Sequence, residues 1–253
     1  MNSFLEKLTA KWDQGKFICI GLDSADFTLN QKVIDQTYSL VCAYKPNSAF
    51  YEAEGIKGWE SLKNTIQYIQ KTAPEVPLIL DAKRGDIGNT NEAYVKAIFD
   101  DLGVDAVTVS PYLGQESLQP FLQKADKGII VLVRTSNPGA GEFQDLIIDV
   151  KPLYQIVAEH VKNWNTNSNL AVVVGATCPE ELKKIREIVG DIPILVPGIG
   201  SQGGDLEATL KNGLNSKKQG LIISSSRGII FAPNPREAAE SLHSQIQEIL
   251  QHV

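Results

Sequence analysis

The sequence is poor in the residues that most often carry acid–base chemistry or bind transition metals. It has three histidines and three cysteines in 253 residues. His160 and His243 lie in helix-patterned segments and His252 lies in the C-terminal tail, so no histidine follows an apolar, strand-like run. A Cys/His zinc site and a histidine general acid or base are therefore not expected. If the chain is an enzyme, lysine and aspartate must transfer the protons.

The cysteines are widely spaced and odd in number, which argues against a disulfide framework. Cys19 and Cys42 lie inside apolar, strand-like runs, and Cys178 stands far from both. This pattern favours reduced thiols over disulfides or metal ligands.

The sequence also lacks an excess of positive charge, and it has no long apolar segment. The 24 Lys and Arg residues are outnumbered by 30 Asp and Glu residues, which gives a formal net charge of −6. A general nucleic-acid-binding role is therefore disfavoured. No segment has the length and apolarity of a membrane span, and the first residues lack the apolar core of a signal peptide. We expect a cytoplasmic protein that binds neither nucleic acid nor membranes.

What the sequence does contain is an alternation of short apolar runs with helix-patterned segments. The runs do not alternate apolar with polar residues, which is typical of strands buried on both faces of a parallel sheet. Eight such units in 253 residues predict one domain, residues 1–253, with an α/β fold of the (β/α)₈ TIM-barrel class. The expected strands are residues 17–22, 41–44, 78–80, 106–109, 128–133, 170–175, 194–196 and 220–223. The expected helices include residues 2–13 (before the first strand), 30–41, 89–102, 116–123, 152–163, 180–189 and 235–250.

The third apolar run ends in the most unusual cluster of charges. Residues 78–80 are Leu-Ile-Leu, and they lead directly into Asp81, Lys83 and, beyond Gly85, Asp86. Charges at the end of a buried strand are costly unless they are paired or used. Because residues two apart in a strand share a face, we expect Asp81 and Lys83 to point to the same side and Asp86 to point elsewhere. Catalytic residues of these barrels lie at the C-terminal ends of strands, so this cluster is the candidate catalytic centre.

Two further strand ends predict a phosphate site. Residues 197–205, Pro-Gly-Ile-Gly-Ser-Gln-Gly-Gly-Asp, follow the seventh run, and Arg227 follows the eighth. Glycines let backbone N–H groups approach an anion, and an arginine can add a bidentate clamp. The loops after strands seven and eight are the recurrent phosphate site of this fold.

The residues alone leave several chemical roles open for the lysines. Lys45 follows the second run, where a structural lysine and a functional lysine are equally well supported. A Schiff-base lysine needs a lowered pKa, whereas neighbouring carboxylates favour the ammonium form. A Mg²⁺ ion could use the aspartates, but two ammonium groups would oppose it. Proton donation by a lysine is the preferred interpretation.

These motifs resemble those of the orotidine 5′-phosphate decarboxylase family. Residues 81–87, Asp-Ala-Lys-Arg-Gly-Asp-Ile, match the D-x-K-x-x-D signature in the K-R-G-D-I form of its second sequence group. The strand-eight end, Ser-Ser-Arg, departs from the Gly-Arg of the first group, and the loop at 137–150 matches only at its start. The other matching positions, in chain order, are Asp23, Lys45, Ser136-Asn-Pro-Gly, Pro197 to Asp205 with Gln202, and Arg227.

The resemblance implies decarboxylation of orotidine 5′-phosphate to uridine 5′-phosphate and CO₂ in de novo pyrimidine biosynthesis, without a metal or organic cofactor. It implies that Lys83 donates the proton to C6 of the pyrimidine and that Asp81 lies beside the substrate carboxylate. Lys45 and Asp86 would complete a Lys-Asp-Lys-Asp row.

The resemblance also implies a homodimer with shared active sites. Three residues would come from the partner subunit: Asp86, Ile87 and Thr90. Four residues of the subunit itself would bind the remainder of the substrate: Asp23 the ribose, Ser136 the base, and Gln202 with Arg227 the phosphate.

Two alternatives remain. A related barrel could act on a sugar phosphate with Mg²⁺, although such relatives place a glutamate two residues before the aspartate, where this chain has Ile79. The chain could also be a catalytically silent phosphate-binding barrel.

Overall fold

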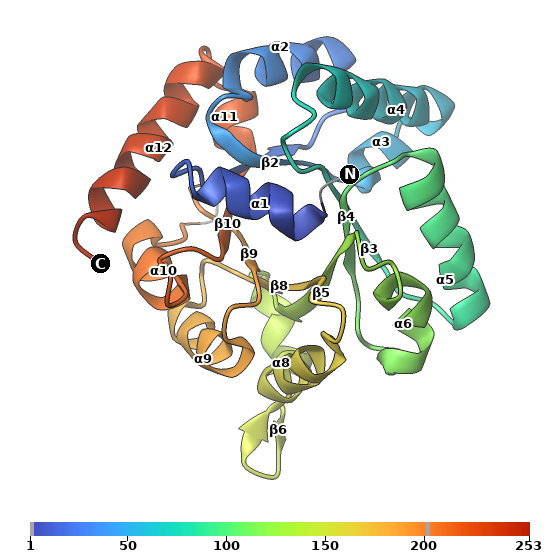
Figure 1. The fold of residues 1–253 in the computed structure, drawn as a ribbon, viewed down its shortest axis with the longest axis vertical. Helices are drawn as coiled ribbons and strands as arrows, with labels where there is room; N and C mark the ends of the chain where they lie inside the picture. The colour runs from blue at the N-terminus through green and yellow to red at the C-terminus, as the bar shows by residue number, and fades with distance from the viewer. Residues whose placement is uncertain (1–2, 201–202) are drawn as a thin grey trace.

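The computed structural model describes residues 3–200 and 203–253, and it contains an eight-stranded parallel sheet (Figure 1). Its strand order is β2-β1-β10-β9-β8-β5-β4-β3. The two ends of this order are joined by parallel bridges from Tyr44 to Leu78 and from Asn47 to Asp81, so the sheet closes on itself. The predicted (β/α)₈ barrel is confirmed. The strands are β1 (Ile18–Leu22), β2 (Val41–Pro46), β3 (Ile79–Arg84), β4 (Ala106–Val109), β5 (Gly128–Arg134), β8 (Leu170–Val174), β9 (Ile194–Pro197) and β10 (Leu221–Ser225).

Helices follow the strands in sequence and form a ring around the sheet (Figure 1). Their apolar sides pack on the outer face of the barrel, which buries both faces of the strands and explains the unbroken apolar runs. The main helices are α2 (Phe27–Thr37), α3 (Ser48–Glu52), α4 (Gly55–Thr72), α5 (Gly88–Val95), α6 (Gly114–Leu122), α8 (Leu153–Trp164), α9 (Pro179–Val189), α10 (Leu206–Gly213) and α12 (Pro235–Leu250).

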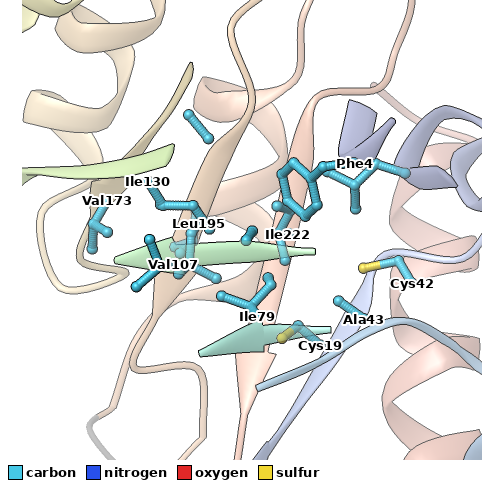
Figure 2. Packing of buried hydrophobic residues seen from close by; sticks show 14 of the residues in the cluster. Phe4, Cys19, Cys42, Ala43, Ile79, Val107, Ile130, Val173, Leu195 and Ile222 are labelled. Atoms are coloured by element: carbon cyan, nitrogen blue, oxygen red, sulfur yellow. The ribbon is translucent and has the colours of Figure 1, made fainter. Parts of the chain in front are cut away.

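The inner face of the barrel is filled by side chains from different strands. Ile79, Val107 and Leu195 are buried and belong to one apolar cluster, and Figure 2 shows them together with the ring of Phe4. Complete burial of one such side chain contributes about 1.5–3 kcal/mol. The interior is therefore a packed core, and any ligand must bind at one end of it.

The N-terminal helix α1 (Phe4–Trp12) covers the N-terminal end of the barrel, where it lies across the sheet in Figure 1. Ser3 caps this helix and forms a capping box with Glu6. The ring of Phe4 lies 2.2 Å from where a Cβ on Gly128 would be, so β5 must begin with glycine. The indole Nε1 of Trp12 donates to the Leu221 carbonyl at 2.8 Å. Because α1 seals this end, the opposite end is left for function.

Some expected helix boundaries are wrong, for local reasons. The helix expected at 30–41 begins at Phe27, because the Asp26 carboxylate accepts from the N–H groups of Thr28 and Leu29. The helix expected at 89–102 is divided into α5 and a π-helical turn, η1 (Lys96–Asp101), closed by a bond from Leu102 N to the Ala97 carbonyl. This wider turn lies where two consecutive apolar side chains, Ile98 and Phe99, are both buried.

The long connection after β5 contains structure that the sequence did not predict. It forms η2 (Pro138–Ala140), α7 (Gly141–Gln144) and an antiparallel hairpin of β6 (Ile147–Ile148) and β7 (Lys151–Pro152). The hairpin projects beyond the ring of helices in Figure 1. In the part of the chain that the structure describes, no helix has the length and apolarity needed to cross a bilayer.

Candidate active site

A cavity of about 550 Å³ opens at the C-terminal ends of the strands. Its wall includes the ends of β1, β2, β3, β9 and β10, the loop after β5 and Thr108 of β4. Six of the residues predicted from the sequence line this cavity: Asp23, Lys45, Asp81, Lys83, Ser136 and Arg227.

The centre of the site is the Asp81 carboxylate between two ammonium groups. Lys45 Nζ lies 3.0 Å from Asp81 Oδ2, and Lys83 Nζ lies 2.7 Å from Asp81 Oδ1. Lys45 and Asp81 are only 5% and 8% exposed, whereas the Lys83 side chain is 49% exposed at the cavity. The structure therefore brings together three of the four members of the predicted charged row.

Strand alternation was expected to bring Asp81 and Lys83 to the same side, but it does not fully explain their contact. Regular strand alternation does not continue through this segment, because Lys83 has a φ of +46°. The pairing of β3 with β4 also shifts register between Leu80 and Arg84. A left-handed backbone is unfavourable for a lysine, so its surroundings must hold it there.

The charges of the buried pair stabilise each other. Burial acts to raise the pKa of Asp81, but the ammonium groups of Lys45 and Lys83 outweigh it and hold this pKa well below its usual range. Burial acts to lower the pKa of Lys45, but Asp81 and then Asp23 raise it above its usual range. Asp81 and Lys45 are therefore both ionised at neutral pH. A raised pKa does not suit Lys45 to Schiff-base chemistry.

Thr108 of β4 is a site residue that sequence reasoning missed. Its buried hydroxyl donates to Asp81 Oδ1 at 2.9 Å, and it accepts from the N–H groups of Ala82 and Lys83 at 3.0 and 2.9 Å. In sequence Thr108 is one residue of an ordinary strand, Ala-Val-Thr-Val. No local signal shows that an irregularity in the neighbouring strand needs its hydroxyl.

Asp23 follows β1 and supplies an acceptor to the same cavity. Its Oδ1 is buried and has no hydrogen-bond partner among the described residues. A buried carboxylate oxygen without a protein partner is costly, and a ligand hydroxyl would satisfy it.

The predicted phosphate loop lies at one side of the cavity. Gly198 and Gly203 have φ values of +107° and +75°, which only glycine adopts readily, and Gly204 N bonds to the Gly198 carbonyl at 3.2 Å. Arg227 begins the neighbouring short helix α11 (Arg227–Ile230) and lines the cavity. The predicted phosphate ligand Gln202 lies outside the described residues.

Asp86, Ile87 and Thr90 are not among the residues that line this cavity. Asn91 holds the segment in place, since its Oδ1 accepts from Asp86 N at 3.1 Å and its Nδ2 donates to the Asp86 carbonyl at 2.6 Å. Asp86 Oδ1 accepts from Ile87 N at 2.7 Å, and Ile87 is 58% exposed. Of these three residues, Ile87 is exposed, whereas Asp86 and Thr90 are half-buried.

The loop after β5 covers another side of the cavity. Ser136 lines the cavity, and Gln144 Oε1 accepts from Thr135 N at 2.8 Å. Arg134 forms an ion pair with Asp145: its Nη2 donates to Oδ2 at 3.0 Å, and its Nε lies 3.0 Å from Oδ1 without forming a hydrogen bond. These contacts attach the base of the loop to the end of β5.

The described residues contain no group of three or more His, Cys, Asp or Glu side chains placed to hold a metal ion. At the catalytic cluster, a divalent cation would also meet the positive charges of Lys45 and Lys83 beside Asp81.

Comparisons with known proteins agree on one family. A family model described as "Orotidine 5'-phosphate decarboxylase / HUMPS family" matches residues 16–242. The orotidine 5′-phosphate decarboxylase of Ralstonia pickettii (strain 12J) is 45% identical over 254 residues, which cover 94% of this chain and 93% of that protein.

Solved structures of similar proteins share the whole fold. The structure of Leishmania donovani OMP decarboxylase has a TM-score of 0.92 and 39% identity, and the match covers 98% of each chain. The structure of Leishmania donovani UMP synthase has a TM-score of 0.95 and 40% identity, covering 99% of this chain but 57% of that one. The chain thus spans a little over half the length of the UMP synthase.

Proposed function

This chain belongs to the orotidine 5′-phosphate decarboxylase / HUMPS family, and on that premise we propose that it converts orotidine 5′-phosphate to UMP and CO₂ in pyrimidine biosynthesis. The observation that carries the proposal is the Asp81 carboxylate held between Lys45 and Lys83 at the cavity. That arrangement places the Lys83 ammonium group where a carbanion would form. No metal or organic cofactor is needed for such a step.

Lys83 is the proposed proton donor. Loss of CO₂ leaves negative charge at C6 of the pyrimidine, which the ring delocalises poorly. The Lys83 ammonium, partly exposed at the cavity, stabilises that charge and then transfers its proton to C6. Its ion pair with Asp81, at 2.7 Å, orients the ammonium group before the substrate arrives.

Asp81 has a second proposed effect on the substrate. The leaving carboxylate would lie beside the Asp81 carboxylate, and two like charges about 4 Å apart interact by roughly 4 kcal/mol at an effective dielectric constant near 20. Departure of CO₂ removes this repulsion. Buried Lys45 limits it by neutralising part of the charge of Asp81.

The remote groups of the substrate supply the binding energy that offsets this repulsion. In our proposal the buried Oδ1 of Asp23 accepts from a ribose hydroxyl, Ser136 binds the base, and Arg227 with Gln202 binds the phosphate. The loop after Ser136 closes over the phosphate.

We also propose a cytoplasmic homodimer in which Asp86, Ile87 and Thr90 complete the site of the partner subunit. Support comes from the exposed position of Ile87 and from its absence from the cavity of its own subunit. Tyr112 and Leu113, just before α6, are also exposed apolar side chains, and α6 packs against α5. Exposed apolar groups gathered in one region are typical of an interface.

The shared site is tested by mixing a Lys83→Ala subunit with an Asp86→Ala subunit. Each variant alone should be inactive, but random exchange should make half of the dimers mixed, with one intact site in each. About a quarter of the wild-type activity should return. Verified subunit exchange without recovery would show that Asp86 does not act across the interface.

The activity itself is tested by following the loss of orotidine 5′-phosphate absorbance on addition of the purified protein. We expect turnover at the same rate with and without a chelator. Turnover that needs Mg²⁺ would indicate the metal-dependent sugar-phosphate branch of the family. Nucleotide binding without CO₂ release would indicate a silent phosphate-binding barrel.

A further inference from the structure

Strand β3 loses its regular pairing with β4 at the catalytic cluster. Leu80 pairs with Val107 and Arg84 pairs with Val109, so three residues of β3, 81–83, lie opposite Thr108 alone. This is a bulge, in which backbone N–H groups lose their usual partners in the ladder. The bulge contains both Asp81 and the left-handed Lys83.

The Thr108 hydroxyl replaces the missing partners. It accepts from the N–H groups of Ala82 and Lys83, and these two bonds occupy its acceptor positions. Its single hydrogen is then left for Asp81 Oδ1, at 2.9 Å. Thr108 is buried, so water does not compete for these bonds.

We infer that Thr108 is a positioning residue for decarboxylation: its hydroxyl joins the backbone of Lys83 to the carboxylate that orients the Lys83 ammonium group. The same hydroxyl therefore fixes the backbone of Lys83, the proposed proton donor, and the carboxylate of Asp81, which pairs with the Lys83 ammonium group. The inference rests on the proposed function and extends it to a residue on β4 that need not contact the substrate.

The charged and titratable groups around Asp81 determine what loss of the hydroxyl does. Lys45 of β2 and Lys83 of β3 pair with the carboxylate, and Asp23 and the Cys19 thiol of β1 are close enough to act on this cluster. Thr108 stabilises the ionised carboxylate as an additional donor. Without it the pKa of Asp81 should rise, since a bond to the charged form is lost.

The central variant is Thr108→Val, which keeps the shape of the side chain and removes its donor and acceptor. We expect kcat to fall by about 10- to 100-fold, the size of a lost hydrogen bond to a charged group, with a smaller change in KM. The acidic limb of the pH profile should move to higher pH. Thr108→Ser restores the hydroxyl and should return kcat to within about threefold of wild type.

Thr209→Val is the matched control. Thr209 is also a buried threonine, on α10, and its hydroxyl has no hydrogen-bond partner among the described residues. This variant should keep the wild-type kcat and pH profile. Thermal unfolding of all variants, followed by circular dichroism, separates loss of fold from loss of rate. If Thr108→Val does not fold, Thr108→Ala, which has neither a donor nor an acceptor, takes its place.

Two results would overturn the inference. One is a wild-type kcat and acidic limb in folded Thr108→Val or Thr108→Ala, and the other is an equal loss in Thr108→Ser, which would assign the effect to shape. Carbon NMR of the Asp81 carboxyl group gives a reading that does not depend on turnover. If the wild-type protein releases no CO₂, the proposed function fails, whereas an unchanged Asp81 titration in Thr108→Val means that the positioning role fails.

Discussion

The end of β3 and the loop after β5 border the same cavity but are built in opposite ways. At the end of β3, Asp81 is 8% exposed and is held by ion pairs with Lys45 of β2 and with Lys83. In the loop after β5, Val150 of the β6–β7 hairpin is 87% exposed, and Ile147, Ile148 and Leu146 are exposed near it. The first region buries paired charges, and the second is a largely exposed loop beside the cavity.

This difference indicates a division of work within the site. Charges act most strongly where water is excluded and their positions are fixed, which is the case beside Asp81. A loop with few buried contacts opens at low free-energy cost, so it suits the admission and release of substrate. Rate should therefore depend on the first region and binding on the second.

The largest effect is expected for Lys83→Ala. Loss of the proposed proton donor, and with it of the cation beside C6, should lower kcat by about 10³-fold or more. The fold should persist, because the Lys83 side chain is half exposed. The measurement is the rate of orotidine 5′-phosphate consumption, with Lys184→Ala, an exposed lysine paired with Glu187, as control. Retained turnover in Lys83→Ala would exclude it as the donor.

The next effect is on stability and comes from Asp81→Asn. The change removes the main counter-charge of the buried Lys45 ammonium, so the free energy of unfolding at pH 7 should fall by about 3 kcal/mol. Urea denaturation measures this loss. Asp101→Asn, which breaks the exposed Lys63 pair, should change the same quantity by less than about 0.5 kcal/mol.

The pH dependence of that difference follows from the two shifted pKa values. The pKa of Asp81 is depressed in the folded state, so its contribution is present above its unfolded pKa and is lost as the pH falls through the folded value. The pKa of Lys45 is raised, so its contribution is present below its unfolded pKa and is lost as the pH rises through the folded value. The stability gap should be constant between about pH 5 and 7, and it should narrow at alkaline pH, because burial without Asp81 lowers the pKa of Lys45 in the variant. A gap that closes between pH 7 and 5 would contradict the burial of the pair.

The smallest effect is expected in the loop after β5. Asp145→Asn weakens the ion pair with Arg134 at the base of the loop, so KM should rise by about three- to tenfold while kcat changes less than about twofold. The control is Asp149→Asn in the hairpin, where a φ of +56° suits asparagine as well as aspartate. A fall in kcat as large as the rise in KM would remove the proposed separation of rate from binding.

Much of the barrel could be predicted from local patterns in the chain. Runs such as 128–133 and 194–196 are apolar because both faces of these strands are buried. The apolar residues of each run therefore predict a buried strand without knowledge of its neighbours. Lys45, Asp81 and Lys83 could be located because each follows such a run. Their roles came from the resemblance of the motifs, and the comparisons place the chain in the same family.

The sequence by itself determined which strands form and which charges stand at their ends, because burial and polarity are properties of each residue and its neighbours in the chain. Tertiary structure decided how those charges meet. The bulge of β3 and the φ of +46° at Lys83 depend on the Thr108 hydroxyl of another strand. Asn91, which holds the turn at Asp86, is itself tied to another helix, because its Nδ2 donates to the Ser117 carbonyl of α6 at 2.6 Å. Hydrogen bonds between distant segments leave no periodic pattern, so only the folded chain reveals them.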